Sequence, residues 1–172
     1  MNVRRSPRQA TVVTPEQSMP LKIFGMDANV LLTTEATGGA VSVVLGHLAP
    51  GDGPPDHVHL KQDEIFYVLE GTVELTAADE TAIAGPGSIV FVPRTVVHRF
   101  RNAGTATVRM LECSLPGGLD RYFKAISDLA ARDGLTREQA MEIGKQFDTG
   151  FPERTAPRGG KDVRRDETPR AE

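Results

Sequence analysis

A chain of 172 residues, of which 39% are apolar, is long enough to bury the core of one ordinary globular domain. Its net charge of −3 excludes the basic surface of a general nucleic-acid-binding protein. The single cysteine, Cys113, permits no internal disulfide, and no apolar run reaches the roughly 18 residues of a membrane-spanning helix. We therefore expect a cytoplasmic protein that binds neither nucleic acid nor membrane.

Residues 1–18 are predicted to form a flexible arm. They contain prolines and scattered polar residues without a sustained apolar pattern. The arginines Arg4, Arg5 and Arg8 are not followed by an apolar stretch, so this arm is not a secretory signal.

Residues 19–116 alternate short β-type segments with turn signals. Residues 40–48, AVSVVLGHL, are rich in β-branched side chains, and Gly85-Pro86-Gly87 is typical of a turn. The predicted strands are residues 21–24, 29–34, 40–48, 64–69, 72–77, 81–84, 88–92 and 106–114, with two more around His57 and His98. About ten short strands at this spacing indicate an all-β sandwich or barrel.

Residues 117–150 change to the period of amphipathic helices. A second helix is predicted to begin at Thr136, whose spacing to Gln139 matches a capping box. Both helices need an apolar surface to cover, which is either the barrel or a second subunit. The apolar stripe of the first helix is Leu119, Tyr122, Phe123, Ile126, Leu129 and Ala130.

Residues 151–172 contain almost no apolar side chains and are predicted to be a disordered tail.

The stretch GDGPPDHVHLKQDEIFYVLEG, residues 51–71, contains half of a candidate metal site. His57 and His59 are two residues apart, so on a strand their side chains point to the same face. Glu64 follows a short polar break and begins a new strand. Two imidazoles and a carboxylate can therefore converge from adjacent strands, but such a site needs another ligand.

The stretch GSIVFVPRTVVHRFRN, residues 87–102, supplies that ligand. His98 lies on an alternating run that places it on one face with Val96 and Phe100. Three imidazoles and one carboxylate suit a divalent transition metal, and iron, manganese, nickel, zinc, cobalt and copper all remain open. The predicted metal ligands are His57, His59, Glu64 and His98.

Together the two stretches resemble the two sequence motifs of the cupin family. The first motif matches through Gly51, His57, His59, Glu64 and Gly71, and the second through Gly87, Pro93, His98 and Asn102. One position departs, because Thr95 stands where the family usually has glycine. Most residues avoid the positive φ that glycine tolerates. The sequence therefore does not determine the backbone conformation of the turn before His98.

The resemblance implies a small jelly-roll β-barrel with the ligands inside one mouth. The segment PGGLDRYF, followed by two helices, is also similar to small single-domain cupins related to quercetin dioxygenases. Cupins commonly dimerise through a sheet face with exchange of N-terminal strands, so we expect a homodimer.

Apolar side chains on the same strand faces are predicted to form the substrate pocket. A pocket with few lysines or arginines favours a neutral or weakly acidic small molecule that chelates metal through neighbouring oxygens, such as an enediol, a flavonol or a dicarbonyl compound. The predicted pocket residues are Phe66, Val68, Phe91, Phe100 and Met110.

Three functions are compatible with this site. The first is a quercetinase-like metal-dependent dioxygenase, in which Glu64 is both a ligand and the base that takes the substrate proton. The second is a non-catalytic cupin that binds metal and a small molecule as a sensor or store. The third is a cupin isomerase.

Overall fold

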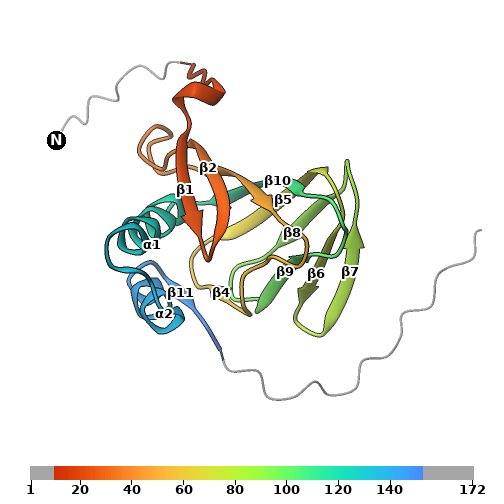
Figure 1. Cartoon of the computed structure of the whole chain (residues 1–172). Coiled ribbons are helices and arrows are strands. Elements are labelled where there is room, and N and C mark those ends of the chain that lie inside the picture. The colour runs from red at the N-terminus through yellow and green to blue at the C-terminus, as the bar shows by residue number, and fades with distance from the viewer. Residues whose placement is uncertain (1–9, 153–172) are drawn as a thin grey trace, which may run out of the picture.

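The computed structural model describes residues 10–152, which form an all-β domain followed by two helices. The expected jelly-roll barrel with C-terminal helices is confirmed (Figure 1). A 3₁₀ turn at Pro15–Gln17 precedes the first strand. The strands are β1 (Met19–Ile23), β2 (Met26–Leu32), β3 (Ser42–Leu48), β4 (Val58–His59), β5 (Asp63–Glu70), β6 (Val73–Ala77), β7 (Glu80–Ala84), β8 (Ile89–Val92), β9 (His98–Asn102), β10 (Val108–Leu115) and β11 (Thr149–Gly150), and the helices are α1 (Leu119–Asp133) and α2 (Arg137–Lys145).

Two antiparallel sheets make the barrel. The larger has the strand order β1-β2-β3-β10-β5-β8, and the smaller has the order β7-β6-β9. Inward-facing side chains of both sheets, including Phe66, Val68, Val73 and Leu75, form one core cluster. The alternating pattern of β5 is therefore read correctly from the sequence: Glu64, Phe66 and Val68 are buried between less buried neighbours.

The two helices cover the end of the large sheet that the small sheet does not reach. In Figure 1, α1 lies beside β1 and α2 lies beside β11, both on the side of the molecule away from β6 and β7. A second core cluster joins α1 to β1, β2 and β3, and it includes Leu21, Val30, Val44, Tyr122 and Ile126. The helices therefore pack on the chain's own sheet, which is the first of the two surfaces expected for them.

The helix ends follow the sequence signals. The hydroxyl of Thr136 accepts a hydrogen bond from the Gln139 backbone N–H, and the Gln139 side chain accepts one from the Thr136 N–H. This is the predicted capping box. Asp120, in the first turn of α1, accepts hydrogen bonds from the backbone N–H and the hydroxyl of Thr34, which ties the helix to the loop after β2.

Two features differ from the expected elements. Strand β2 begins at Met26, earlier than expected, and pairs with β1 through a tight turn at Phe24 and Gly25. The short strand β11 was not predicted, and it pairs with β4 through Thr149 and His59. Residues 1–9 of the predicted arm and residues 153–172 of the predicted tail lie outside the described residues, and the rest of the arm contains the 3₁₀ turn at Pro15–Gln17.

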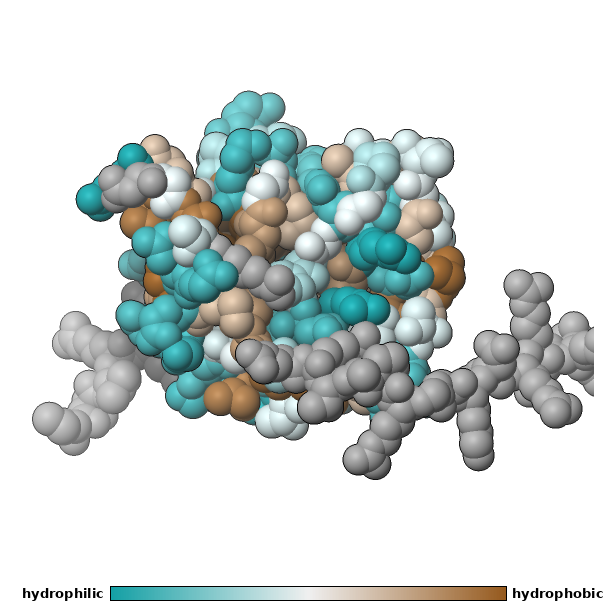
Figure 2. Space-filling view, turned by 60° about the horizontal axis from the view of Figure 1, so that its bottom comes forward, coloured by the Kyte–Doolittle hydropathy of each residue, from teal (hydrophilic) through white to brown (hydrophobic). Residues whose placement is uncertain are grey.

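The surface is mixed in polarity. Figure 2 shows a face on which hydrophilic residues alternate with smaller hydrophobic areas. Among the described residues, no helix has the length and apolar composition that a membrane span requires.

Candidate metal centre

Backbone pairing brings the two histidine segments together. His57 and His98 form an antiparallel bridge in which each backbone N–H donates to the other's carbonyl at 2.9 Å. The N–H of Thr95 donates to the carbonyl of His59 at 2.7 Å. Segments about forty residues apart in sequence are therefore held in one register by their own main chains.

Glu64 reaches the same place from the large sheet. It is the second residue of β5, pairs with Val92 of β8 and with Ser114 of β10, and is 2% exposed. Because β5 alternates, its side chain points into the barrel.

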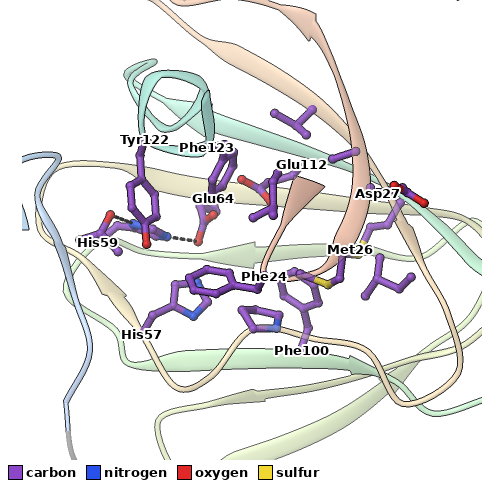
Figure 3. A pocket seen from close by; sticks show the side chains of 18 of the residues that line it. Phe24, Met26, Asp27, His57, His59, Glu64, Phe100, Glu112, Tyr122 and Phe123 are labelled. Atoms are coloured by element: carbon purple, nitrogen blue, oxygen red, sulfur yellow. Dashed lines mark hydrogen bonds and ion pairs between the residues drawn. The ribbon is translucent and has the colours of Figure 1, made fainter. Parts of the chain in front are cut away.

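The four predicted ligands converge. One ligand atom from each of His57, His59, Glu64 and His98 lies within 4.8 Å of all the others. The Oε2 atom of Glu64 lies 2.7 Å from Nε2 of His98 and 3.4 Å from Nε2 of His59. Figure 3 shows His59 and Glu64 side by side at the cavity wall, with His57 nearby.

Each histidine has its outer ring nitrogen occupied. The Nδ1 atoms of His57 and His98 lie 2.9 and 3.0 Å from the carbonyls of Pro55 and Val96. The Nδ1 atom of His59 lies 3.1 Å from the Thr149 hydroxyl. A hydrogen bond from Nδ1–H fixes the tautomer and leaves the lone pair of Nε2 free to bind a metal. This is the usual arrangement of a metal-ligating imidazole.

The inner atoms, by contrast, contact one another without forming hydrogen bonds of good geometry. Nε2 of His59, Nε2 of His98 and Oε2 of Glu64 are buried without a hydrogen bond of good geometry to any described residue. Buried polar atoms without partners cost free energy, and a buried carboxylate costs more. A divalent cation at their centre satisfies all of them, and this donor set fits a first-row transition metal better than Mg²⁺ or Ca²⁺, which prefer oxygen ligands.

The protonation of the four groups follows from their burial and their contacts. Burial lowers the pKa of His57 to about 3 and lowers that of His59, so both imidazoles are neutral at pH 7. Burial alone would raise the pKa of Glu64, but His59 and His98 hold it below its usual value. Burial opposes the charging of His98, yet the contact with Glu64 raises the pKa of His98 above its usual value. Of the three imidazoles, His98 is therefore the one whose surroundings favour the protonated form, and that form must lose its proton before Nε2 can ligate a metal.

Thr95 adopts the conformation that glycine would supply. Its φ is 70°, in the left-handed region, and the turn before His98 closes with the Thr95 N–H bonded to His59. The preceding residue, Arg94, donates three hydrogen bonds to the carboxylate of Asp63, one from its backbone and two from its guanidinium group. These contacts hold the turn in place although a glycine is missing.

An apolar cavity adjoins the site and is lined by residues of both core clusters. His57, His59 and Glu64 line it, whereas His98 is 2% exposed and lies behind the wall. No lysine or arginine occurs among the described residues that line it. Its apolar walls include Phe24, Met26, Leu48, Phe100, Met110, Tyr122, Phe123 and Phe151.

The structure divides the predicted pocket residues into three groups. Phe100 and Met110 line the cavity. Phe66 and Val68 do not line it, because they are fully buried in the barrel core. Phe91 faces away from it: its position on β8 is on the outer side of the sheet, and the residue is 60% exposed. The expectation for Phe91 is wrong, because its neighbour Val92 is the residue of β8 that turns inward.

Sequence reasoning missed several contributors, among them two residues after α2 and one on β10. Thr149 and Phe151 come from the segment after α2, which carries no motif, and Phe151 stacks near both His57 and Phe24. Glu112 also lines the cavity from β10. Its place in the alternating run 108–115 is the one signal that could have identified it, because it shares the inward parity of Met110.

Comparison with known proteins agrees with this geometry. The model of the Cupin domain family matches residues 44–114, which include all four converging ligands. The chain is 31% identical to "Polyketide synthase CurC" of Streptomyces cyaneus over 75% of this chain and 89% of that protein. It is 30% identical to quercetin 2,3-dioxygenase of Bacillus subtilis over 54% of this chain and 27% of that protein.

A solved structure shows the same fold at low identity. KdgF from Halomonas sp. superposes with a TM-score of 0.57 and 17% identity, covering 64% of this chain and 99% of that one.

Proposed function

The chain belongs to the cupin family, and we propose that it is a metal-dependent enzyme that binds a small enolisable chelator and removes a proton from it for reaction with dioxygen. The substrate class is flavonols, enediols and 1,3-dicarbonyl compounds. The observation that supports this proposal most directly is that one carboxylate and three imidazoles converge beside an apolar cavity, which Glu64, His57 and His59 line.

The cavity supports this class of substrate over charged ones. The described lining residues provide no cation to pair with a phosphate or sulfate, and they already include three carboxyl groups, those of Asp27, Glu64 and Glu112. Aromatic side chains, among them Phe24 and Phe100, offer flat apolar surfaces that suit a planar ligand and exclude water.

His57, His59 and His98 would hold the metal through Nε2, and Glu64 through Oε2. When bound, the metal supplies Lewis acidity to a substrate oxygen and, if it is redox-active, electron transfer with dioxygen. Glu64 is the described group best placed to accept the acidic proton of the substrate, because its carboxylate is ionised beside the imidazoles and faces the cavity. The rings of His57 and His59 stay oriented by their Nδ1 contacts during that transfer.

The named relatives support this proposal in different ways. The quercetin dioxygenase acts, by its name, on quercetin, and it is similar to this chain over 92 residues. A non-oxidative reaction on a polyketide-type 1,3-dicarbonyl is the second candidate, because "Polyketide synthase CurC" is similar over more of both chains. Both reactions begin by removing a proton from an enolisable carbon or hydroxyl, so both assign the same role to Glu64.

The testing experiment combines metal analysis with oxygen consumption. Protein purified without chelator is loaded separately with iron, manganese, nickel, cobalt, copper or zinc, and then supplied with flavonols, enediols and 1,3-dicarbonyls. Oxygen uptake with any redox-active metal supports the dioxygenase. Product formation without oxygen uptake supports the second candidate, and tight binding without turnover indicates a binding protein.

Two variants separate the ligand role from the base role. Glu64→Gln keeps a ligating oxygen but removes the proton acceptor, so turnover per bound metal should fall by roughly 10²–10⁴-fold. His98→Ala should remove metal and activity together. If turnover per bound metal in Glu64→Gln equals that of the wild type, Glu64 is not the base.

A further inference from the structure

A second carboxyl group, that of Glu112, faces the cavity beside the metal centre. Glu112 lies on β10 opposite Phe66 of β5, and Glu64 is two residues from Phe66 on the same face. Diagonal neighbours of this kind are typically about 7–8 Å apart along the sheet, close enough for one small ligand to reach both. Figure 3 shows Glu112 on the same side of the cavity as Glu64.

The surroundings of Glu112 provide no partner for its carboxyl group. Its neighbours across the sheet are Val44 and Phe66, and Met110 precedes it on the inner face. Within the described part of the chain, this side chain forms no hydrogen bond or ion pair. The structure therefore leaves the carboxyl group available to a molecule in the cavity.

The carboxyl group is also unnecessary for packing or for the metal. Replacing it with an apolar side chain would continue the apolar wall, and four ligands converge without it. Burial and the negative charge of Glu64 raise the pKa of Glu112 well above its usual range, so its presence costs stability rather than adding to it.

We propose that Glu112 is a specificity-determining residue that accepts a hydrogen bond from a hydroxyl group of the substrate while the chelating oxygens of the substrate face the metal centre. A carboxyl group can accept such a bond whether or not it is protonated, so the assignment does not depend on its charge. The inference rests on the proposed function and narrows its substrate class to chelators that carry a further hydroxyl group.

The test measures binding to zinc-loaded protein, because zinc is redox-inert and leaves the ligand intact. The probes are 3-hydroxyflavone, which has only the chelating pair of oxygens, and a series of flavonols that each carry one further hydroxyl at a different ring position. We expect the wild type to bind at least one member of the series roughly three- to tenfold more tightly than 3-hydroxyflavone, as one hydrogen bond allows.

Three variants make the test specific. Glu112→Met is apolar and of adaptable shape, and it should lose that preference while it keeps its affinity for 3-hydroxyflavone and its zinc content. Glu112→Gln keeps a carbonyl acceptor and should retain the preference. Glu80→Met, on the exposed strand β7, is the matched control and should behave as the wild type.

The failure of this inference is distinguishable from that of the proposed function. If zinc-loaded wild type binds 3-hydroxyflavone but shows no preference within the series, or if Glu112→Met keeps the preference, Glu112 has no such role and the proposed function stands. If zinc-loaded wild type binds no flavonol, both the flavonol class and the role of Glu112 are overturned.

Discussion

At the scale of single residues, the metal centre depends on side chains that are oriented before any ion binds. Each imidazole has one nitrogen held by a neighbouring oxygen and the other directed at the centre. Two of those oxygens belong to the backbone within two residues of the histidine, so the local chain supplies them. The third belongs to Thr149, 90 residues away in sequence, and is the one that a side-chain substitution can remove.

We predict that Thr149→Val weakens metal binding by about 10–100-fold, as removal of an outer hydrogen-bond partner of a metal ligand typically does. The substitution preserves volume but removes the acceptor for Nδ1–H of His59. The dissociation constant is measured by competition with a metal-binding dye. Thr81→Val is the control, because it removes a hydroxyl contact with Thr76 that involves none of the four ligands. Equal dissociation constants for Thr149→Val and the wild type would contradict the predicted role.

Thr95 provides a second prediction at this scale. A β-branched residue at φ 70° is strained by roughly 1–2 kcal/mol, whereas glycine adopts this conformation freely at an entropic cost of about 0.5–1 kcal/mol. Thr95→Gly should therefore raise the free energy of unfolding by up to about 1 kcal/mol in urea denaturation. Thr105→Gly is the control, because the φ of Thr105 is not positive, and it should destabilise the protein instead. A loss of stability in Thr95→Gly would show that the threonine side chain stabilises this turn.

At the scale of elements, α1 and the segment after α2 complete a cavity that the barrel alone leaves open. Tyr122 and Phe123 of α1 form part of its wall, and β11 pairs with β4 next to His59. The hydroxyl of Tyr122 donates to the carbonyl of Ala140, which joins the two helices. The helices and the segment after them therefore form part of the cavity beside the candidate metal centre.

We predict that Ile126→Ala costs about 2–5 kcal/mol in free energy of unfolding, as truncation of a buried aliphatic side chain typically does. Ile126 is 0% exposed in the cluster between α1 and the sheet. Urea denaturation measures the change. Ile83→Ala, at a residue that is 63% exposed, serves as the control and should shift stability by no more than about 0.5 kcal/mol. A cost for Ile126→Ala as small as that of the control would mean that α1 is not part of the cooperative fold.

At the scale of the whole molecule, the outer face of the large sheet carries apolar residues without a cover among the described residues. Tyr67, Ile89 and Phe91 are 41%, 69% and 60% exposed, and the strand register places Tyr67 opposite Ile89 and Ile65 opposite Phe91. Leu111 of β10 extends the same face, because it pairs with Tyr67. Contiguous exposed apolar surface of this kind is typical of an interaction site.

We propose that two copies of the chain associate through this face. Light scattering at micromolar concentration should give twice the monomer mass of 18.6 kDa. Phe91→Glu should shift the mass toward the monomer, because it places a charge in the apolar contact. Ile83→Glu, which changes an isoleucine of similar exposure on β7, should leave the dimer intact. A wild-type mass near 18.6 kDa would refute the homodimer.

The sequence by itself determined the class of fold and the four residues that converge. Strand alternation has a period of two, so the spacing of His57 and His59 and the place of Glu64 on β5 specify their faces without any knowledge of the rest of the chain. The capping box at Thr136 and the stripe of α1 are equally local signals, and both are confirmed. Family resemblance then added the barrel, which periodicity alone could not distinguish from a sandwich.

Only the tertiary structure decided which other groups surround the site. Phe91 and Val92 are adjacent in sequence, and the pairing of β8 with β5 sends one outward and the other inward. Thr149 reaches His59 only because α1 and α2 pack on the large sheet and return the chain to β4. Glu112 looks like an ordinary strand residue until the register of β10 places it diagonally from Glu64. Such contacts join residues that are distant in sequence, and their geometry depends on packing and register, which local periodicity does not specify.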